Sequence, residues 1–244
     1  MRRFWDARAA EDPFYFVDNR LRYREPDLER FWAGGAESLD LMLELLGAEL
    51  RPGTDVVEIG CGVGRVTRAL ASRGARVRAL DVSERMLDAA RELNPGLDGV
   101  EWVLGDGHSL AGIADESADA VQSHVVFQHI PDPQVTLGYV REIGRVLRPG
   151  GWAALHLSNA PERHRGPGFA ARAQGAVRSL LHRAPRGQNH PAWLGSAVDL
   201  DELRTVAGEA AMHLERVVGA GSPNCLVLLH KGPEGPEPPD REPH

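Results

Sequence analysis

Three alternate glycines, Gly60, Gly62 and Gly64, follow a short apolar strand expected at residues 56–59. Glycine permits positive φ and has no Cβ, so a ligand can approach the bare backbone of such a loop. A helix expected at residues 65–72 begins directly after the glycines, and its first backbone amides have no partner within the helix. This arrangement predicts a binding site for a nucleotide-like molecule at the carboxyl end of a buried strand.

Two carboxylates are placed to serve the same ligand. Asp81 ends the next expected strand, about twenty residues after the glycines, where a carboxylate can accept hydrogen bonds from both hydroxyl groups of a ribose. Asp106 follows the strand after that, where it can accept a hydrogen bond from an adenine amino group. Alone, Asp81 also fits a charge at a helix N-terminus and Asp106 a turn residue. Together, in this order, they favour a ligand site at one edge of a sheet.

Strand and helix patterns alternate along the central part of the chain. The expected strands lie at 56–59, 76–81, 100–104, 119–125 and 152–157, and the expected helices at 36–46, 65–72, 84–93, 133–147 and 199–210. This alternation predicts an α/β fold with a parallel sheet covered by helices on both faces. Residues 213–218 and 225–230, separated by a glycine-containing turn, are expected to form a terminal β-hairpin.

Composition limits the class of protein. The chain has 244 residues and 42% apolar content, enough for one globular domain with a substantial core. Two cysteines, Cys61 and Cys225, are too few for a disulfide framework or a zinc site. The net charge of −7 argues against broad nucleic-acid binding. With no apolar run of membrane-spanning length and no signal-like start, we expect a cytoplasmic protein without a membrane partner.

The segments that flank the predicted core carry the main open questions. Residues 1–50 are expected to form a helical, aromatic-rich N-terminal cap, with Asp12-Pro13 dividing its first helical part. The aromatic rings either pack this cap onto the main domain at 51–231 or make it a lid, with Tyr15 or Trp5 at the mouth of the site. The tail at 232–244 contains five prolines and is expected to be disordered.

An insertion expected at 159–198 follows the fifth strand and is the candidate for substrate selection. Six arginines against one acid give it a charge of +5, and an amphipathic helix is expected at 168–183. It is either a solvated basic surface or a lid whose arginines attract an anionic acceptor. Asn189, His190 and Trp193 are candidate substrate contacts.

Several motifs resemble those of a known family. They are V-V-E-I-G-C-G-V-G-R, A-L-D-V-S, G-D-G, A-D-A-V-Q-S-H-V-V-F-Q-H-I-P-D and L-R-P-G-G-W, in this order. The chain resembles the class I S-adenosylmethionine-dependent methyltransferases, and within them the small-molecule branch that includes ubiquinone and menaquinone methyltransferases. The resemblance is close over 55–157 and loose over the last helix and hairpin. It implies a Rossmann-like three-layer sandwich with a seven-stranded, mostly parallel sheet in the order 3-2-1-4-5-7-6, the last strand antiparallel.

The resemblance also implies the cofactor, S-adenosyl-L-methionine, and the product S-adenosyl-L-homocysteine. The glycine loop would surround the methionine part, Glu58 would help to hold that loop, and Asp81 would bind the ribose. Val82 and Met86 would be apolar neighbours of the adenosine, while Ser123 and His124 would border the sulfonium. The full set of cofactor-binding residues so implied is Glu58, Gly60, Cys61, Gly62, Gly64, Asp81, Val82, Met86, Asp106, Gly107, His108, Ser123 and His124.

A catalytic base is needed only if the acceptor arrives protonated, as an alcohol or an ammonium does. His129, which follows the fourth strand, and His124 are the candidates, because an unperturbed histidine pKa near 6.5 suits proton removal around neutrality. Two alternatives stay open: His129 instead braces its loop by hydrogen bonding, and His124 simply lines the cofactor pocket. His156, at the end of the fifth strand, is a third candidate that better fits a buried structural histidine.

The sequence therefore predicts methyl transfer to an oxygen or nitrogen of a small-molecule acceptor, possibly anionic, by a monomer or homodimer without a metal. A protein or peptide methyltransferase and a non-catalytic cofactor-binding protein are the alternatives. A nicotinamide dehydrogenase is disfavoured, because its loop would be G-x-G-x-x-G and its Tyr-x-x-x-Lys pair is missing, Lys231 being the only lysine.

Overall fold

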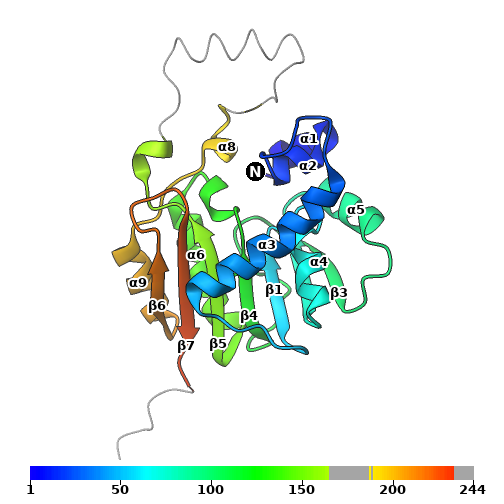
Figure 1. The fold of residues 1–244 in the computed structure, drawn as a ribbon. Coiled ribbons are helices and arrows are strands. Elements are labelled where there is room, and N and C mark those ends of the chain that lie inside the picture. Colours follow the sequence, from blue (N-terminus) through cyan, green and yellow to red (C-terminus); the bar gives the residue numbers. More distant parts are fainter. Residues whose placement is uncertain (165–186, 188, 234–244) are drawn as a thin grey trace, which may run out of the picture.

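A computed structural model describes residues 1–164, 187 and 189–233 (Figure 1). The amphipathic helix expected at 168–183 and nearly all of the tail lie outside the described residues. Within the described part of the chain, no helix is both long and apolar enough to cross a membrane.

The sheet confirms the predicted topology. Its strands are β1 (Asp55–Ile59), β2 (Arg76–Asp81), β3 (Val100–Leu104), β4 (Ala118–Ser123), β5 (Leu147–Leu157), β6 (Met212–Val218) and β7 (Cys225–Lys231). Their order is β3-β2-β1-β4-β5-β7-β6, and β7 lies antiparallel between β5 and β6. The carboxyl ends of the five parallel strands therefore share one edge of the sheet.

The helices lie on both faces of the sheet and above that edge. They are α1 (Arg2–Glu11), α2 (Pro13–Val17), α3 (Leu28–Leu46), α4 (Arg65–Ser72), α5 (Glu84–Leu93), α6 (Pro133–Val146), α8 (Pro191–Leu194) and α9 (Leu200–Glu209), with short 3-10 turns η1 (Phe127–His129) and η2 (Pro161–His164). Figure 1 shows α1, α2 and α8 gathered above the carboxyl ends of the parallel strands.

Buried side chains on both faces of the sheet hold the layers together. Leu39 of α3, Leu70 of α4 and Leu87 of α5 pack on one face of the sheet. On the other face, α6 and α9 contribute residues such as Ile143 and Leu203. Local signals in the sequence set the helix ends: as predicted, Asp12 separates α1 from α2, and Gly47 ends α3 in the left-handed conformation with φ of +70°.

Two strand boundaries differ from the prediction. β5 begins at Leu147 rather than 152, because Leu147 already pairs with Ala118 and the residues up to Trp152 form an irregularity in the register. β4 ends at Ser123 rather than 125, because Val125 adopts a left-handed conformation with φ of +59° that cannot continue a strand.

A close crossing of α3 and α4 positions Arg65, the first residue after the glycine loop. A Cβ atom added to Gly35 would overlap the backbone oxygen of Arg65. One added to Gly34 would meet only side-chain ends, at 3.4 Å from the Arg65 guanidinium, 3.5 Å from that of Arg20 and 3.8 Å from the Asp18 carboxylate. The absent side chain at Gly35 therefore allows the two helix backbones to meet.

We expect Gly35→Ala to lower the free energy of unfolding by about 1–3 kcal/mol, because two rigid backbones would have to separate. The matched control Gly34→Ala should change it by less than about 1 kcal/mol, since better helix propensity offsets a mild contact. Urea denaturation followed by circular dichroism measures both. Equal stabilities of the two variants would contradict the assignment of Gly35 as the contact point.

Candidate active site

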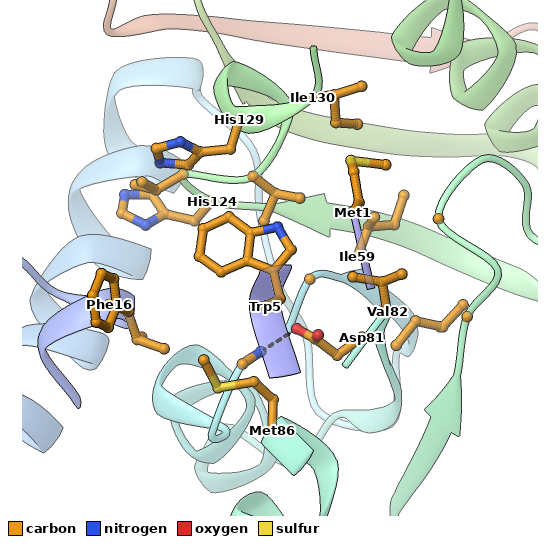
Figure 2. Close-up of a pocket in the computed structure, with 18 of the residues that line it drawn as sticks. Met1, Trp5, Phe16, Ile59, Asp81, Val82, Met86, His124, His129 and Ile130 are labelled. Carbon is orange, nitrogen blue, oxygen red and sulfur yellow. Dashed lines mark hydrogen bonds between the residues drawn. The ribbon is translucent and has the colours of Figure 1, made fainter. Parts of the chain in front are cut away.

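A pocket opens at the carboxyl ends of β1, β2 and β4, and α1 lies over it (Figures 1 and 2). Its lining includes the glycine loop, Asp81 and the two candidate histidines. The structure thus brings together, in one cavity, the residues that the sequence placed after separate strands.

Two of the three loop glycines face the pocket. Gly60 and Gly62 line it, with φ of +76° and +55°. A Cβ on Gly60 would overlap Val126, and one on Gly62 would come within 2.8 Å of Val17, so the loop fits closely even before a ligand binds. Gly64 does not line the pocket: with φ of +87° it starts α4 beside Trp102, and that position needs glycine for packing.

The carboxylate of Asp81 lies at the edge of the glycine loop (Figure 2). One oxygen accepts a hydrogen bond from the Gly62 amide at 2.9 Å, and the other accepts from the Ser83 amide at 2.8 Å. Burial raises the pKa of Asp81 to about 6, although these amide donors oppose the change. Desolvation thus disfavours the charged form of Asp81, but the carboxylate is still ionised at neutral pH. Its oxygens keep lone pairs that can accept hydrogen bonds from hydroxyl groups.

Three predicted cofactor residues lie behind the pocket wall and support it. Glu58 is buried and accepts a hydrogen bond from the Thr67 hydroxyl at 2.5 Å, and burial raises its pKa to about 7. The Ser123 hydroxyl donates to the Ile59 carbonyl at 3.0 Å and so ties β4 to β1. Cys61 is buried within the loop and does not line the pocket.

On the side of the pocket near β3, the backbone and apolar side chains form the lining. Val82, Met86 and Gly107 line it as expected, but Asp106 and His108 do not. Although burial pushes the pKa of Asp106 upward, hydrogen bonds within its own turn, including one from the His108 amide at 2.8 Å, hold it below its usual value. The His108 ring is exposed and lies 3.0 Å from the same carboxylate. Asp106 therefore shapes the turn that presents Gly107.

The helix α1 is fastened over this side of the pocket. The Arg2 guanidinium donates to the Val82 carbonyl at 3.1 Å and to the Gly105 carbonyl at 3.0 Å. Asp6 accepts a hydrogen bond from the Ser83 hydroxyl at 2.7 Å. Trp5 lines the pocket, as the lid interpretation requires.

The other predicted aromatic contacts lie away from the lining. Tyr15 does not line the pocket: it packs against Phe16 and Tyr23. His190 stacks on Phe4 of α1 with ring centroids 4.4 Å apart, and Trp193 meets the edge of Phe16 at 5.6 Å. These rings join α8 to the N-terminal helices and form a roof. The Asn189 side chain is exposed and lines no part of the pocket.

His129 lines the pocket in a fixed tautomer. Its Nδ1 lies 2.9 Å from the carbonyl oxygen of Trp193, and because a carbonyl only accepts hydrogen bonds, Nδ1 carries the proton. Nε2 is then the unprotonated nitrogen. Burial lowers the pKa of His129 to about 4, although the Trp193 carbonyl opposes this, so the ring is neutral at pH 7. Gly195, with φ of +64°, permits this contact, because a Cβ there would overlap the Gln128 carbonyl.

His124 also lines the pocket, but it differs from His129 in its hydrogen bonding. Its Nδ1 is buried, and no hydrogen-bond partner is found for it among the described residues. Burial lowers the pKa of His124 to about 3, so it too is neutral. Val125, the next residue, is a β-branched residue with φ of +59°, a conformation that costs on the order of 1–3 kcal/mol. His156 is 6% exposed and lies outside the lining, as the sequence favoured.

Sequence reasoning missed part of the lining. Val126, Ile130 and Tyr139 border the pocket but have no polar atom that points to chemistry, apart from the Tyr139 hydroxyl. The signal for Val126 was the apolar run directly after the fourth strand; Ile130 is also part of the buried core. Among the described residues, no group of three or more histidine, cysteine or acidic side chains is arranged to hold a metal ion.

Comparisons with known proteins give a consistent family. Residues 57–155 match a family described as a methyltransferase domain. A ubiquinone biosynthesis O-methyltransferase of Xanthomonas axonopodis pv. citri is 27% identical over 89% of this chain and 78% of its own length. The biotin biosynthesis bifunctional protein BioHC of Cellvibrio japonicus is 41% identical over 47% of this chain, which spans only 21% of that protein.

Among solved structures, a putative methyltransferase of Haloferax volcanii, in complex with the methyltransferase activator Trm112, shares the fold. The TM-score is 0.61 at 22% identity, covering 94% of this chain and 98% of that one.

The geometry around His129 predicts its NMR signature. With ¹⁵N-labelled histidine, we expect a protonated Nδ1 and an unprotonated Nε2, with no titration between about pH 8 and pH 5, unlike an ordinary histidine. Gly195→Ala should abolish this signature by displacing the Trp193 carbonyl. In the control Gly208→Ala a Cβ meets nothing within 4 Å, so the signature should be kept. Identical spectra of the two variants would contradict the role of Gly195.

Proposed function

The chain belongs to the class I S-adenosylmethionine-dependent methyltransferases, and we propose that it transfers the methyl group of its cofactor to an oxygen or nitrogen of a small acceptor molecule. The observation that carries the proposal is His129, a neutral imidazole with a free Nε2 in the same pocket as Asp81 and the bare glycine backbone. The names of relatives that are ubiquinone biosynthesis O-methyltransferases support an oxygen acceptor.

The residues of the pocket fit S-adenosylmethionine. Asp81 would accept hydrogen bonds from the ribose hydroxyls, since it lines the pocket beside the loop and its carboxylate is only partly buried. Gly60 and Gly62 would contact the methionine part with their backbone atoms, which line the pocket. Val82 and Met86 would pack against the adenine, which has an apolar face.

The bound cofactor supplies a methyl group on a positively charged sulfur, which is an activated electrophile. The chain has three tasks beside it: to orient the acceptor, to exclude water and to remove a proton. Trp5 and the helix α1 cover the pocket and shield it from solvent. His129 Nε2 would take the proton from an acceptor hydroxyl as its oxygen bonds to the methyl carbon and the bond from that carbon to sulfur breaks. An acceptor ammonium would have to lose its proton first, because a protonated nitrogen has no lone pair with which to attack.

Coverage of the pocket supports a small acceptor over a peptide. The helix α1 is held to the loops after β2 and β3 by hydrogen bonds of Arg2 and Asp6. An extended polypeptide would have to displace this helix, whereas a compact molecule fits beneath it. We accordingly propose that α1 and α2, within residues 1–50, act as a cap on the main domain.

Ionisation of Asp81 should control cofactor binding. Its pKa of about 6 means that the carboxylate becomes protonated below that pH and loses acceptor capacity for the ribose hydroxyls. We therefore expect the affinity for S-adenosylhomocysteine to be constant above about pH 7 and to fall about tenfold per pH unit below about pH 6. Isothermal titration calorimetry across this range measures it.

The variant Asp81→Asn serves as the control, because its side chain does not titrate. It should bind S-adenosylhomocysteine weakly and with no such pH dependence, even though Glu58, with a pKa of about 7, is still present. Tight binding by Asp81→Asn at neutral pH would remove the ribose role from this residue.

Replacement of His129 should impair turnover without impairing cofactor binding. For His129→Gln we expect kcat to fall about 10²- to 10⁴-fold, the usual contribution of a general base. Turnover is followed as label transfer from methyl-labelled cofactor to the best acceptor in a panel of phenols, alcohols and amines. His213→Gln, on the exposed strand β6, should keep the parental rate.

An equal loss of S-adenosylhomocysteine affinity in His129→Gln would show that the residue braces the loop. Undiminished turnover in this variant would show that the acceptor needs no base.

A further inference from the structure

The end of the pocket assigned to the adenine lacks the polar side chains that the sequence predicted for it. Asp106 and His108 do not line the pocket, whereas Val82 and Met86, which do, have apolar side chains. In Figure 2 Val82 lies on the other side of Trp5 from the two candidate histidines. Apolar contacts hold any flat ring, so recognition of adenine, whose ring nitrogens accept hydrogen bonds, requires a polar atom in this part of the lining.

Tyr139 of α6 has a hydroxyl group that fits this need. The residue lines the pocket, although only 6% of its surface is exposed. Its hydroxyl forms no hydrogen bond with any described residue, and it is not among the fully enclosed polar atoms that lack a partner. The hydroxyl therefore keeps some accessible surface, and the pocket is the space that Tyr139 borders. Because a buried tyrosine hydroxyl usually has a partner, we expect a ligand atom to supply it here.

Packing fixes the direction of the Tyr139 ring. The ring meets the edge of Phe127, with centroids 5.6 Å apart and an interplanar angle of 70°. Both rings belong to the buried core that also contains Ile59 and Leu80, near the carboxyl ends of β1 and β2. Since the core already holds the ring, the side chain loses little further freedom when its hydroxyl binds a ligand.

Contacts of α6 place Tyr139 beside the loop after β3. A Cβ atom added to the adjacent Gly138 would lie 3.9 Å from the carbonyl oxygen of His108. Glu142, three residues after Tyr139 and on the same side of the helix, accepts a hydrogen bond from a backbone amide of that loop at 3.1 Å. The same loop contributes Gly107 to the lining. Tyr139 therefore borders the adenine end of the pocket.

The charges on this side of the pocket keep the hydroxyl protonated. Burial, and then the carboxylates of Asp106 and Asp81, raise the pKa of Tyr139. The hydroxyl therefore retains its proton at neutral pH and can donate a hydrogen bond. Asp81, the carboxylate of the lining, is ionised at this pH and can only accept, so it cannot bond to a ring nitrogen.

We propose that the Tyr139 hydroxyl donates a hydrogen bond to a ring nitrogen of the adenine of S-adenosylmethionine. This inference rests on the cofactor of the proposed function and is independent of the methyl acceptor. It assigns adenine recognition to a side chain of α6, whereas Asp106, which the sequence predicted for this role, shapes the neighbouring turn.

Deaza analogues of S-adenosylhomocysteine, in which C–H replaces one ring nitrogen, test this together with Tyr139→Phe. We expect the parent to bind one of the 1-deaza, 3-deaza and 7-deaza analogues about three- to tenfold more weakly than S-adenosylhomocysteine, because one neutral hydrogen bond is lost. Tyr139→Phe should lose a similar factor for S-adenosylhomocysteine, and should bind it and that analogue within about twofold of each other. Isothermal titration calorimetry measures each affinity.

Two controls separate a binding role from a structural one. Tyr15 does not line the pocket, so Tyr15→Phe should keep the parental discrimination among the analogues. The Tyr139 hydroxyl has no hydrogen-bond partner among the described residues, so without ligand the urea midpoint of Tyr139→Phe should be no lower than that of the parent.

The outcomes separate this inference from the proposed function. If the protein is folded but does not bind S-adenosylhomocysteine, the proposed function fails and this inference fails with it. If the parent binds S-adenosylhomocysteine and all three analogues equally well, or if the discrimination survives in Tyr139→Phe, only this inference is overturned. A urea midpoint of Tyr139→Phe below that of the parent overturns it as well, because the hydroxyl would then serve the fold.

Discussion

The hydrogen bond from the Gly62 amide to the partly buried Asp81 carboxylate joins the two elements on which the site is built. It ties the loop after β1 to the end of β2, and the amides of Gly60 and Cys61 reinforce it by donating to the Leu80 carbonyl at 2.7 and 2.9 Å. Because the carboxylate is desolvated, its amide donors are needed to keep it in the fold. The same bonds fix the position of Gly60 and Gly62, whose backbone lines the pocket.

Much of the fold could be predicted because local signals coincide with it. The bounds of α4 and α5 follow from the glycine at Gly64 and the cap at Ser83. In β2, Val77 lies between two arginines, whereas β3 is apolar except for Glu101. The packing of the N-terminal helices against α8 could not be predicted from local signals. Their rings meet across nearly the whole length of the chain, as Phe4 and His190 do, and no local pattern specifies such a contact.

The position of a residue after a strand predicted its place near the pocket more reliably than its residue type predicted its role there. Asp81 and the first two loop glycines line the pocket, whereas Gly64 and Asp106 serve helix packing and a turn. Motif spacing fixes which loop a residue lies in, but the direction of its side chain depends on the turn geometry. The buried pair of Arg65 and Asp18 was beyond prediction, because it requires the close approach of α3 and α4 at Gly35.

The contact that fixes the tautomer of His129 comes from a main-chain carbonyl, that of Trp193. Any amino acid at position 193 supplies the same oxygen, provided that Gly195 lets the backbone follow its path. The side chain of Trp193 is thus not needed for this hydrogen bond, although its ring packs near those of Phe16 and His129. The hydrogen bond that sets the tautomer therefore depends on the path of the main chain through Gly195, and a substitution at position 193 can alter the surroundings of the ring without removing the carbonyl.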